Sequence, residues 1–289
     1  NAFGGGVFSA QQVTDSPAGF SRSLKATVTT TDGSLGTTHY YSIQQMIEGQ
    51  DMISAQFGSG QAQTLALSFW VKASVTGTFA VALQNGAQNR TYPATYTIAS
   101  ANTWQQVKVI IAGDTTGTWA TDTTNGMSVL FMLSAGTNFN GTAGAWAGTN
   151  TPSTSGCTNT FMGTNVNTFQ ISGVQLEVNT QVTPFEYLFL QTEYSRNQRY
   201  FWNVPGPTVY WVGGYTSGAG ANLWLNVNNP VSMRVAPTGN IVSSGANNIA
   251  SSSLNSTAIT HVQYQITSAA TGAMGLNIGV GSLFTSEFA

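Results

Sequence analysis

The first two thirds of the chain alternate apolar and polar residues with a period of two, which is the spacing of a half-buried β-strand. The clearest example is 65–72 (LALSFWVK), where every second residue is large and apolar and Trp70 lies on the opposite face. Turn signals such as Asn85-Gly86, typical of a two-residue hairpin, interrupt the pattern at short intervals. The predicted strands cover residues 7–15, 20–31, 39–48, 65–72, 78–83, 90–98, 104–111, 127–134 and 169–178.

Strands at this spacing, with no helical pattern before residue 187, predict an antiparallel β-sandwich. About eight to ten strands suit a jelly roll, which hides most sheet edges by doubling the sheet. Periodicity alone does not distinguish a jelly roll from other sandwiches. We expect Trp70, Trp104 and Phe131 in the core of this sandwich.

The pattern changes within 168–202. Residues 169–178 alternate, but Gly173 breaks the phase, which predicts either one strand with a bulge or two short strands. Pro184 ends the pairing because proline has no N–H to donate to a ladder. Residues 187–202 then fit one helix, with an inward face formed by Leu188, Gln191, Tyr194, Gln198 and Trp202.

A second, smaller β-unit is expected after Pro205-Gly206-Pro207, which has the composition of a linker. Its predicted strands are 208–213, 221–227, 231–235, 258–267 and 273–284, with a polar Ser/Asn/Gly-rich region at 239–257. The chain therefore divides into a flexible tether at 1–6, a jelly roll at 7–186, a helix and linker at 187–204 and a small β-domain at 205–289. The glycines of the tether suggest that a further segment precedes it.

Composition narrows the choice of partners. Only 6% of residues are charged, against about 25% in typical proteins, and the net charge is −2. This argues against nucleic acid as a partner, and near-neutral chains tend to associate. No apolar run reaches the ~18 residues needed to span a bilayer, so we expect no membrane insertion. The single cysteine, Cys157, excludes an intrachain disulfide.

Catalytic chemistry has little support in the sequence. His39 and His261 lie in strand-like segments beside no catalytic motif, and no Cys/His spacing predicts a metal site. A glycosidase needs two carboxylates about 5–9.5 Å apart, and the neighbouring acidic residues, Glu48 with Asp51 and Asp114 with Asp122, better suit turns or strand ends. We therefore expect no enzyme activity, no cofactor and no metal.

Three segments together resemble a signature of phage tail-fibre and other virion appendage proteins: 169–178 (FQISGVQLEV), 183–186 (TPFE) and 198–200 (QRY). Weaker matches to the same family occur at 45–49, 67–74, 77–79, 232–237 and 286–288. The resemblance extends over nearly the whole chain from about residue 8. It implies a jelly roll like a carbohydrate-binding module, carried by a homo-oligomer, commonly a trimer, on the surface of a phage particle.

The resulting hypothesis is a non-enzymatic virion appendage protein that contacts other virion proteins and adheres to host surface glycan. Aromatic rings at strand edges or in loops are the candidates for stacking on sugars: Trp146, Trp119, Tyr92 and Tyr96. The candidates for contact between chains are Tyr194, Tyr200, Trp202, Trp211 and Trp224. Two alternatives stay open, a capsid-decorating or head-fibre protein without a ligand, and a glycan depolymerase acting through Glu48 and Asp51.

Overall fold

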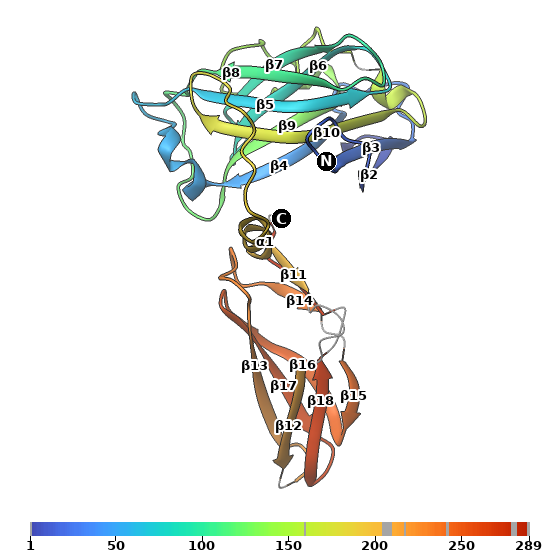
Figure 1. Ribbon diagram of the computed structural model, residues 1–289, viewed down its shortest axis with the longest axis vertical. Helices are drawn as coiled ribbons and strands as arrows, with labels where there is room; N and C mark the ends of the chain where they lie inside the picture. The colour runs from blue at the N-terminus through green and yellow to red at the C-terminus, as the bar shows by residue number, and fades with distance from the viewer. Residues whose placement is uncertain are drawn as a thin grey trace. The chain divides into compact units, whose positions relative to one another are not determined.

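The computed structural model describes residues 2–158, 160–203, 210–216, 218–240, 243–278 and 282–287. The chain forms two compact units, Asn1–Glu186 and Tyr187–Ala289, which we call unit 1 and unit 2 (Figure 1). Each unit has its own core, so each is described by itself.

Unit 1 is a sandwich of two five-stranded sheets, and every pairing between their strands is antiparallel. This confirms the predicted antiparallel jelly-roll sandwich. Three short 3₁₀ helices, η1 (Gly49–Ala55), η2 (Thr137–Phe139) and η3 (Phe161–Gly163), lie in its connections. The first sheet has the order β1 (Ala2–Phe3), β4 (Tyr40–Glu48), β9 (Asn125–Ala135), β6 (Gly77–Asn85), β7 (Thr91–Ile98). The second has the order β2 (Val7–Val13), β3 (Ser23–Thr30), β10 (Thr168–Val178), β5 (Leu65–Ala73), β8 (Gln105–Ile111).

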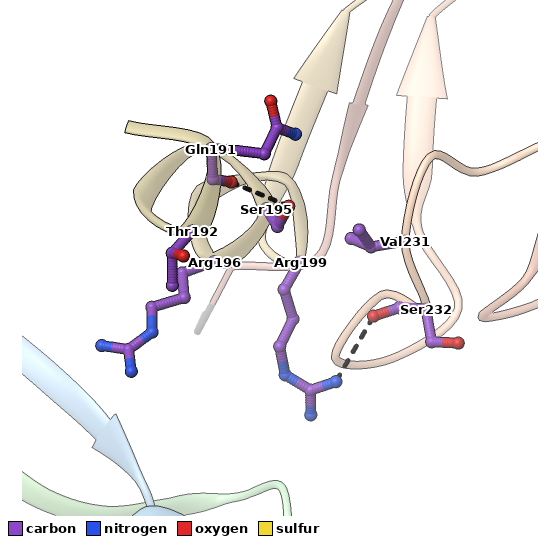
Figure 2. A pocket seen from close by; sticks show the side chains of 7 residues that line it. All are labelled: Gln191, Thr192, Ser195, Arg196, Arg199, Val231 and Ser232. Carbon is purple, nitrogen blue, oxygen red and sulfur yellow. Dashed lines mark hydrogen bonds between the residues drawn. The ribbon is translucent and has the colours of Figure 1, made fainter. Parts of the chain in front are cut away.

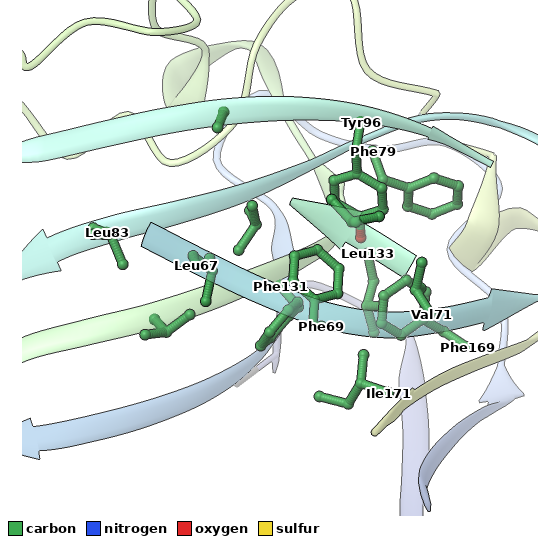
Figure 3. Close-up of a cluster of buried hydrophobic side chains, with 14 of the residues drawn as sticks. Leu67, Phe69, Val71, Phe79, Leu83, Tyr96, Phe131, Leu133, Phe169 and Ile171 are labelled. Atoms are coloured by element: carbon green, nitrogen blue, oxygen red, sulfur yellow. The ribbon is translucent and has the colours of Figure 1, made fainter. Parts of the chain in front are cut away.

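The core of unit 1 lies between the two sheets and is built around aromatic rings (Figure 3). Phe69 of β5 is fully buried, with its ring centroid 4.9 Å from that of Phe131 and 5.2 Å from that of Tyr96. The alternation of β5 thus places one face inward as predicted, and Phe131 is a core residue. Trp70 and Trp104, also expected in the core, are only half-buried. That expectation was wrong because the alternation turns both indoles to the outer side of the sheet, where the Lys72 ammonium lies over the Trp104 ring.

The N-terminal glycines are not the flexible tether that their sequence suggested. Residues 2–3 pair with Tyr41 and Tyr40 of β4, and the Gly6 N–H donates to the Tyr41 hydroxyl over 2.8 Å. A Cβ on Gly4 would lie only 2.3 Å from the same hydroxyl oxygen. Glycine therefore serves close packing at this position, and flexibility was the wrong interpretation of the run.

Strand β10 is continuous but changes register at Gly173. The pairing with β5 shifts between Ser172 and Gln175, and Gly173 has a φ of +55°. A Cβ at Gly173 would lie 2.4 Å from the Phe20 ring, and Phe20 in turn makes an edge-to-face contact with Phe185 at 5.0 Å. Of the two interpretations left open by the sequence, the single strand with a bulge is the correct one.

Beyond the bulge, two side chains of β10 bind the segment that leaves unit 1. The Thr183 N–H and hydroxyl donate to the two carboxylate oxygens of Glu177, each over 2.8 Å. The Glu186 N–H donates to Gln175 Oε1, also over 2.8 Å. We call this set of contacts the β10 clasp. Burial acts to raise the pKa of Glu177, but the hydrogen bonds donated by Thr183 and Gln175 hold that pKa below its ordinary value of 4.5.

Within its described residues, unit 2 contains one helix and three small sheets. The helix is α1 (Leu190–Gln198), and the sheets have the orders β11-β19-β14, β12-β18-β15 and β13-β17-β16. The strands are β11 (Phe201–Asn203), β12 (Tyr210–Thr216), β13 (Asn222–Asn228), β14 (Thr238–Asn240), β15 (Ser243–Asn247), β16 (Ile249–Thr257), β17 (His261–Ser268), β18 (Gly272–Ile278) and β19 (Leu283–Thr285).

Three expectations for unit 2 need correction. The helix is shorter than 187–202, and none of its residues is buried. Residues 231–235 form no strand, although Met233 is buried. The polar region 239–257 contains β15 and β16, because backbone pairing to β18 and β17 forms these strands without an apolar face. The expected linker at 205–207 lies outside the described residues.

Trp202 is a core residue of unit 2 and not a contact between chains as expected. It lies in β11, is 6% exposed and stacks on Phe284 with the ring centroids 4.7 Å apart. Its Nε1–H donates to Asn229 Oδ1 over 3.2 Å. Of the other candidates for contact between chains, Tyr194 and Trp224 are exposed and Tyr200 is half-buried, while the side chain of Trp211 lies outside the described part.

Replacing Phe69 with Ala should lower the free energy of unfolding of unit 1 by about 3–5 kcal/mol, because it removes a fully buried ring between two sheets. Chemical denaturation of the full chain measures this loss. Trp70→Ala is the control, since Trp70 is its half-buried neighbour on the outer face, and we expect it to cost about 1 kcal/mol. Equal losses for both variants would contradict the placement of the core.

Glu177→Gln should lower the free energy of unfolding at pH 7 by about 1 kcal/mol, because it removes a charged acceptor of the β10 clasp. A carboxylate whose pKa is lowered on folding stabilises the protein above its unfolded pKa, and this stability is lost as pH falls through the folded value. The difference between wild type and variant should therefore shrink below about pH 4.5. Urea unfolding across pH, with Glu186→Gln as the control, tests this; a gap that widens in acid would refute it.

Candidate functional site

Four aromatic side chains from distant parts of unit 1 meet among its loops, and we call them the aromatic cluster. They are Phe57, Tyr92, Trp119 and Trp146. The Trp119 and Trp146 rings meet edge to face at 5.4 Å, and Phe57 lies 4.9 Å from the first and 5.6 Å from the second. The Tyr92 ring lies 5.3 Å from Trp146. The structure thus brings together three of the four aromatic residues predicted from the sequence.

Both indole N–H groups of the cluster hold the loops that carry them. Trp146 Nε1–H donates to the Ala112 carbonyl over 2.7 Å, and Trp119 Nε1–H to the Thr116 carbonyl over 3.2 Å. A backbone bridge between Thr91 and Ala147 ties the long loop to the edge of β7. The two rings are therefore fixed in orientation, although they lie in segments without regular structure.

An ion pair supports the loop that carries Trp119. Arg90 donates from Nε and Nη2 to the two carboxylate oxygens of Asp114 over 2.6 and 2.7 Å. Asp114 also accepts the N–H and hydroxyl of Thr116, and only 2% of this residue is exposed. The hydrogen bonds that Arg90 donates to Asp114 raise the pKa of the Arg90 guanidinium. The sequence indicated a turn at Asp114, but the pairing with Arg90 depends on the fold.

The cluster presents a surface and does not enclose a ligand. Phe57, Trp119 and Trp146 are half-buried, and Tyr92 is 8% exposed. The cavity beside Phe57 and Trp119 measures about 40 Å³, which admits a water molecule but no sugar ring.

Tyr96 is not part of this surface, so its prediction as a glycan contact was wrong. It is 8% exposed, packs against Phe69 and Phe79, and lies in the core of unit 1. Burial raises the pKa of its hydroxyl well above the ordinary value. Tyr96 shares the inward face of β7 with Tyr92, but only Tyr92 lies beneath Trp146. Phe57 was missed because it follows a short helix and carries no strand pattern.

A second hollow lies in unit 2, beside α1 (Figure 2). It is an open groove of about 420 Å³, and the Arg196 and Arg199 side chains extend along it. Arg199 Nη1 donates to the Ser232 carbonyl over 3.4 Å, which links the helix to the segment after β13. The lining residues are Gln191, Thr192, Ser195, Arg196, Arg199, Val231 and Ser232.

The acidic pairs weighed as catalytic groups have structural contacts. Glu48 is fully buried and accepts a hydrogen bond from Gln50, while Asp51 is exposed in η1. Asp122 accepts the N–H and hydroxyl of Thr124, as expected for a turn. Within the described residues, no group of three His, Cys, Asp or Glu side chains could hold a metal ion, and no helix is both long and apolar enough to cross a membrane.

No family model matches the sequence, and neither does any curated protein. Solved structures that are similar include the enzymatically active domain of bacteriophage CBA120 tailspike protein 4, with a TM-score of 0.36 and 14% identity over 62% of this chain. The match spans 19% of that tailspike chain. A family 11 carbohydrate-binding module from Clostridium thermocellum has a TM-score of 0.33 and 12% identity over 63% of this chain and 89% of its own. At these values, neither likeness carries an argument about function.

Asp114→Ala should lower the free energy of unfolding by about 3 kcal/mol, because it leaves the Arg90 guanidinium without its bidentate partner. Near-UV circular dichroism of wild type and Trp146→Ala, recorded beside the Asp114 variant, separates the contribution of the cluster from that of the other aromatic rings. Asp122→Ala removes an exposed turn carboxylate and should destabilise the protein far less than Asp114→Ala does. A similar loss for the two variants would mean that the ion pair does not support the cluster.

Proposed function

We propose that this protein is a non-enzymatic structural component of a phage appendage, exposed on the particle, and that its aromatic cluster adheres to host surface glycan. The observation that carries the proposal is the pair of indole rings, Trp119 and Trp146, fixed at the surface of unit 1. Sugar rings stack on aromatic faces, and neutral polar side chains bind their hydroxyl groups. The loop around Trp146 is rich in Gly, Thr, Asn and Ser, which suits this chemistry.

The contacts of the acidic residues support the non-enzymatic part of the proposal. Asp114 is committed to Arg90, and Asp122 caps a turn. Glu48 is buried, so it lacks the access to a glycosidic bond that a general acid needs. We therefore favour display and adhesion over depolymerisation.

We further propose that the protein acts as a homo-oligomer, with a trimer as the favoured form. Helix α1 has no buried residue, and large apolar side chains on and before it are exposed within its unit: Tyr187, Phe189, Leu190 and Tyr194. Contact with other chains or other virion proteins would cover them. Repetition of one weak glycan site in an oligomer would raise the avidity of the particle.

A ligand-free decorating role is the second candidate, and one observation favours it. Both indole N–H groups of the cluster are used within the protein, and the rings pack edge to face against one another. Such a cluster would stabilise long loops without any ligand. Binding to glycan decides between the two candidates.

Trp146→Ala should weaken binding on a glycan array at least about ten-fold, since it removes one of the two rings proposed to stack on sugar. The matched control is Trp104→Ala, which also removes a half-buried indole and its N–H hydrogen bond from unit 1. The control should bind as the wild type does. Absence of binding by the wild type would favour the ligand-free role, and equal binding by Trp146→Ala would place the glycan elsewhere.

A further inference from the structure

Trp224 is the most exposed of the tryptophans whose side chains are described, with 54% of its surface accessible within its unit. It lies in β13, at the edge of the sheet β13-β17-β16 (Figure 1). The opposite face of this sheet carries the buried residues Val262, Tyr264 and Ile266. Trp224 is therefore on the outer face and takes no part in the core of unit 2.

The residues around Trp224 on this outer face are neutral and polar. The strand register places Trp224 opposite Gln265 of β17, which in turn lies opposite Ser253 of β16. We call this surface the Trp224 face. Its residues on β13 and β17, which alternate with the inward ones, are Asn222, Trp224, Asn226, Gln263, Gln265 and Thr267.

Hydrogen bonds across the strands orient the amides of the face. Asn255 Nδ2 donates to Gln263 Oε1 over 2.7 Å, and Gln263 Nε2 donates to Asn226 Oδ1 over 3.1 Å. The Thr267 hydroxyl donates to Asn222 Oδ1 over 2.9 Å. The Nδ2 groups of Asn222 and Asn226 are then donors toward solvent, each about 7 Å along the strand from Trp224.

The scarcity of charged residues in this region indicates which class of ligand the Trp224 face could bind. From residue 200 onward, the only Lys, Arg, Asp or Glu residues in the sequence are Arg234 and Glu287, and neither lies on the three strands of the face. An anionic polymer would find no Lys or Arg there, and His261 lies at the far end of β17, four residues from Gln265. A protein partner would be expected to meet several apolar side chains around the indole. One exposed ring between oriented amides and hydroxyls instead matches a neutral sugar.

We propose that the Trp224 face is a second glycan-binding site, which takes a neutral polysaccharide by stacking a sugar ring on Trp224. The flanking amides of Asn222, Asn226 and Gln265 bind the hydroxyl groups of that ring and its neighbours. The site is separate from the aromatic cluster of unit 1 and does not depend on it. Because no charge takes part, binding is insensitive to salt.

Affinity gel electrophoresis of the full chain tests the proposal. The gels contain glucan, mannan or galactan as neutral probes, and alginate as an anionic control. We expect at least one neutral polysaccharide to retard the wild type, with no effect of alginate and no loss in high salt. Trp224→Ala should weaken the retardation at least about ten-fold, and Asn226→Ala should weaken it by a smaller factor.

Two control variants distinguish the Trp224 face from the aromatic cluster and from exposed rings in general. Phe3→Ala removes an exposed ring from unit 1, 62% accessible, and should bind as the wild type does. Trp146→Ala alters the aromatic cluster alone. Retardation that persists in Trp146→Ala but is lost when Trp224→Ala is added would assign that binding to the Trp224 face. Light scattering of each variant gives its oligomeric state, and the melting midpoint of Trp224→Ala should equal that of the wild type because its ring is not buried.

The proposal is overturned by retardation that Trp224→Ala leaves unchanged, or by no retardation of the wild type with any of the three neutral probes. A smaller oligomer for Trp224→Ala would also overturn it, because the ring would then be a contact between copies of the chain. Retardation by alginate that disappears in salt and in Trp224→Ala would contradict it too, because the face would then bind an anionic polymer through charge.

Discussion

The change of register at Gly173 is the constraint on which much of unit 1 depends. Before the bulge, β10 directs Phe169 and Ile171 into the core between the sheets. After it, the same strand presents Gln175 and Glu177 to the segment that leaves the sandwich. A regular strand would keep one alternation throughout, so the bulge lets one strand both bury apolar side chains and bind the departing chain. Residues 169–178 and 183–186 therefore act together, because the bulge in the strand sets which side chains hold the segment that follows it.

Most of unit 1 could be predicted from its sequence because one face of each strand is buried and the period-two pattern is strong. Unit 2 was harder for a physical reason. The strands β15 and β16 consist largely of Ser, Asn and small residues, so backbone pairing specifies them and alternation does not. Trp202 fitted a helical face as well as a strand, and only its stacking on Phe284, distant in sequence, decides between them. Likewise Tyr92 and Tyr96 share one face of β7, and the loop that carries Trp146 determines which of them joins the aromatic cluster.

The scarcity of charge shapes how this protein holds its loops. With 6% charged residues, most tertiary polar contacts are made by amides, hydroxyls and backbone groups. The Arg90–Asp114 pair is an exception, and it lies where a loop carrying a functional candidate must be held in place. Elsewhere Gln175, Asn229 and Gln263 fulfil similar roles without charge. Such contacts are short-ranged, so a surface with so few charges offers little electrostatic steering to any partner.

The two aromatic surfaces differ in how much of each ring is accessible and in which polar groups lie beside it. In the aromatic cluster, each indole N–H is bound within the protein and the two indole rings meet edge to face. Under the proposed function, sugar would bind this cluster through preorganised apolar contact. Trp224 has more than half of its surface accessible and amides on both sides, so at the proposed second site hydrogen bonds to hydroxyl groups would add to stacking. Each contact is weak alone because water competes for the same hydroxyl groups. A protein with a site in each unit would gain from binding a long polymer at several points, so polymer length should matter more than the affinity for any single sugar.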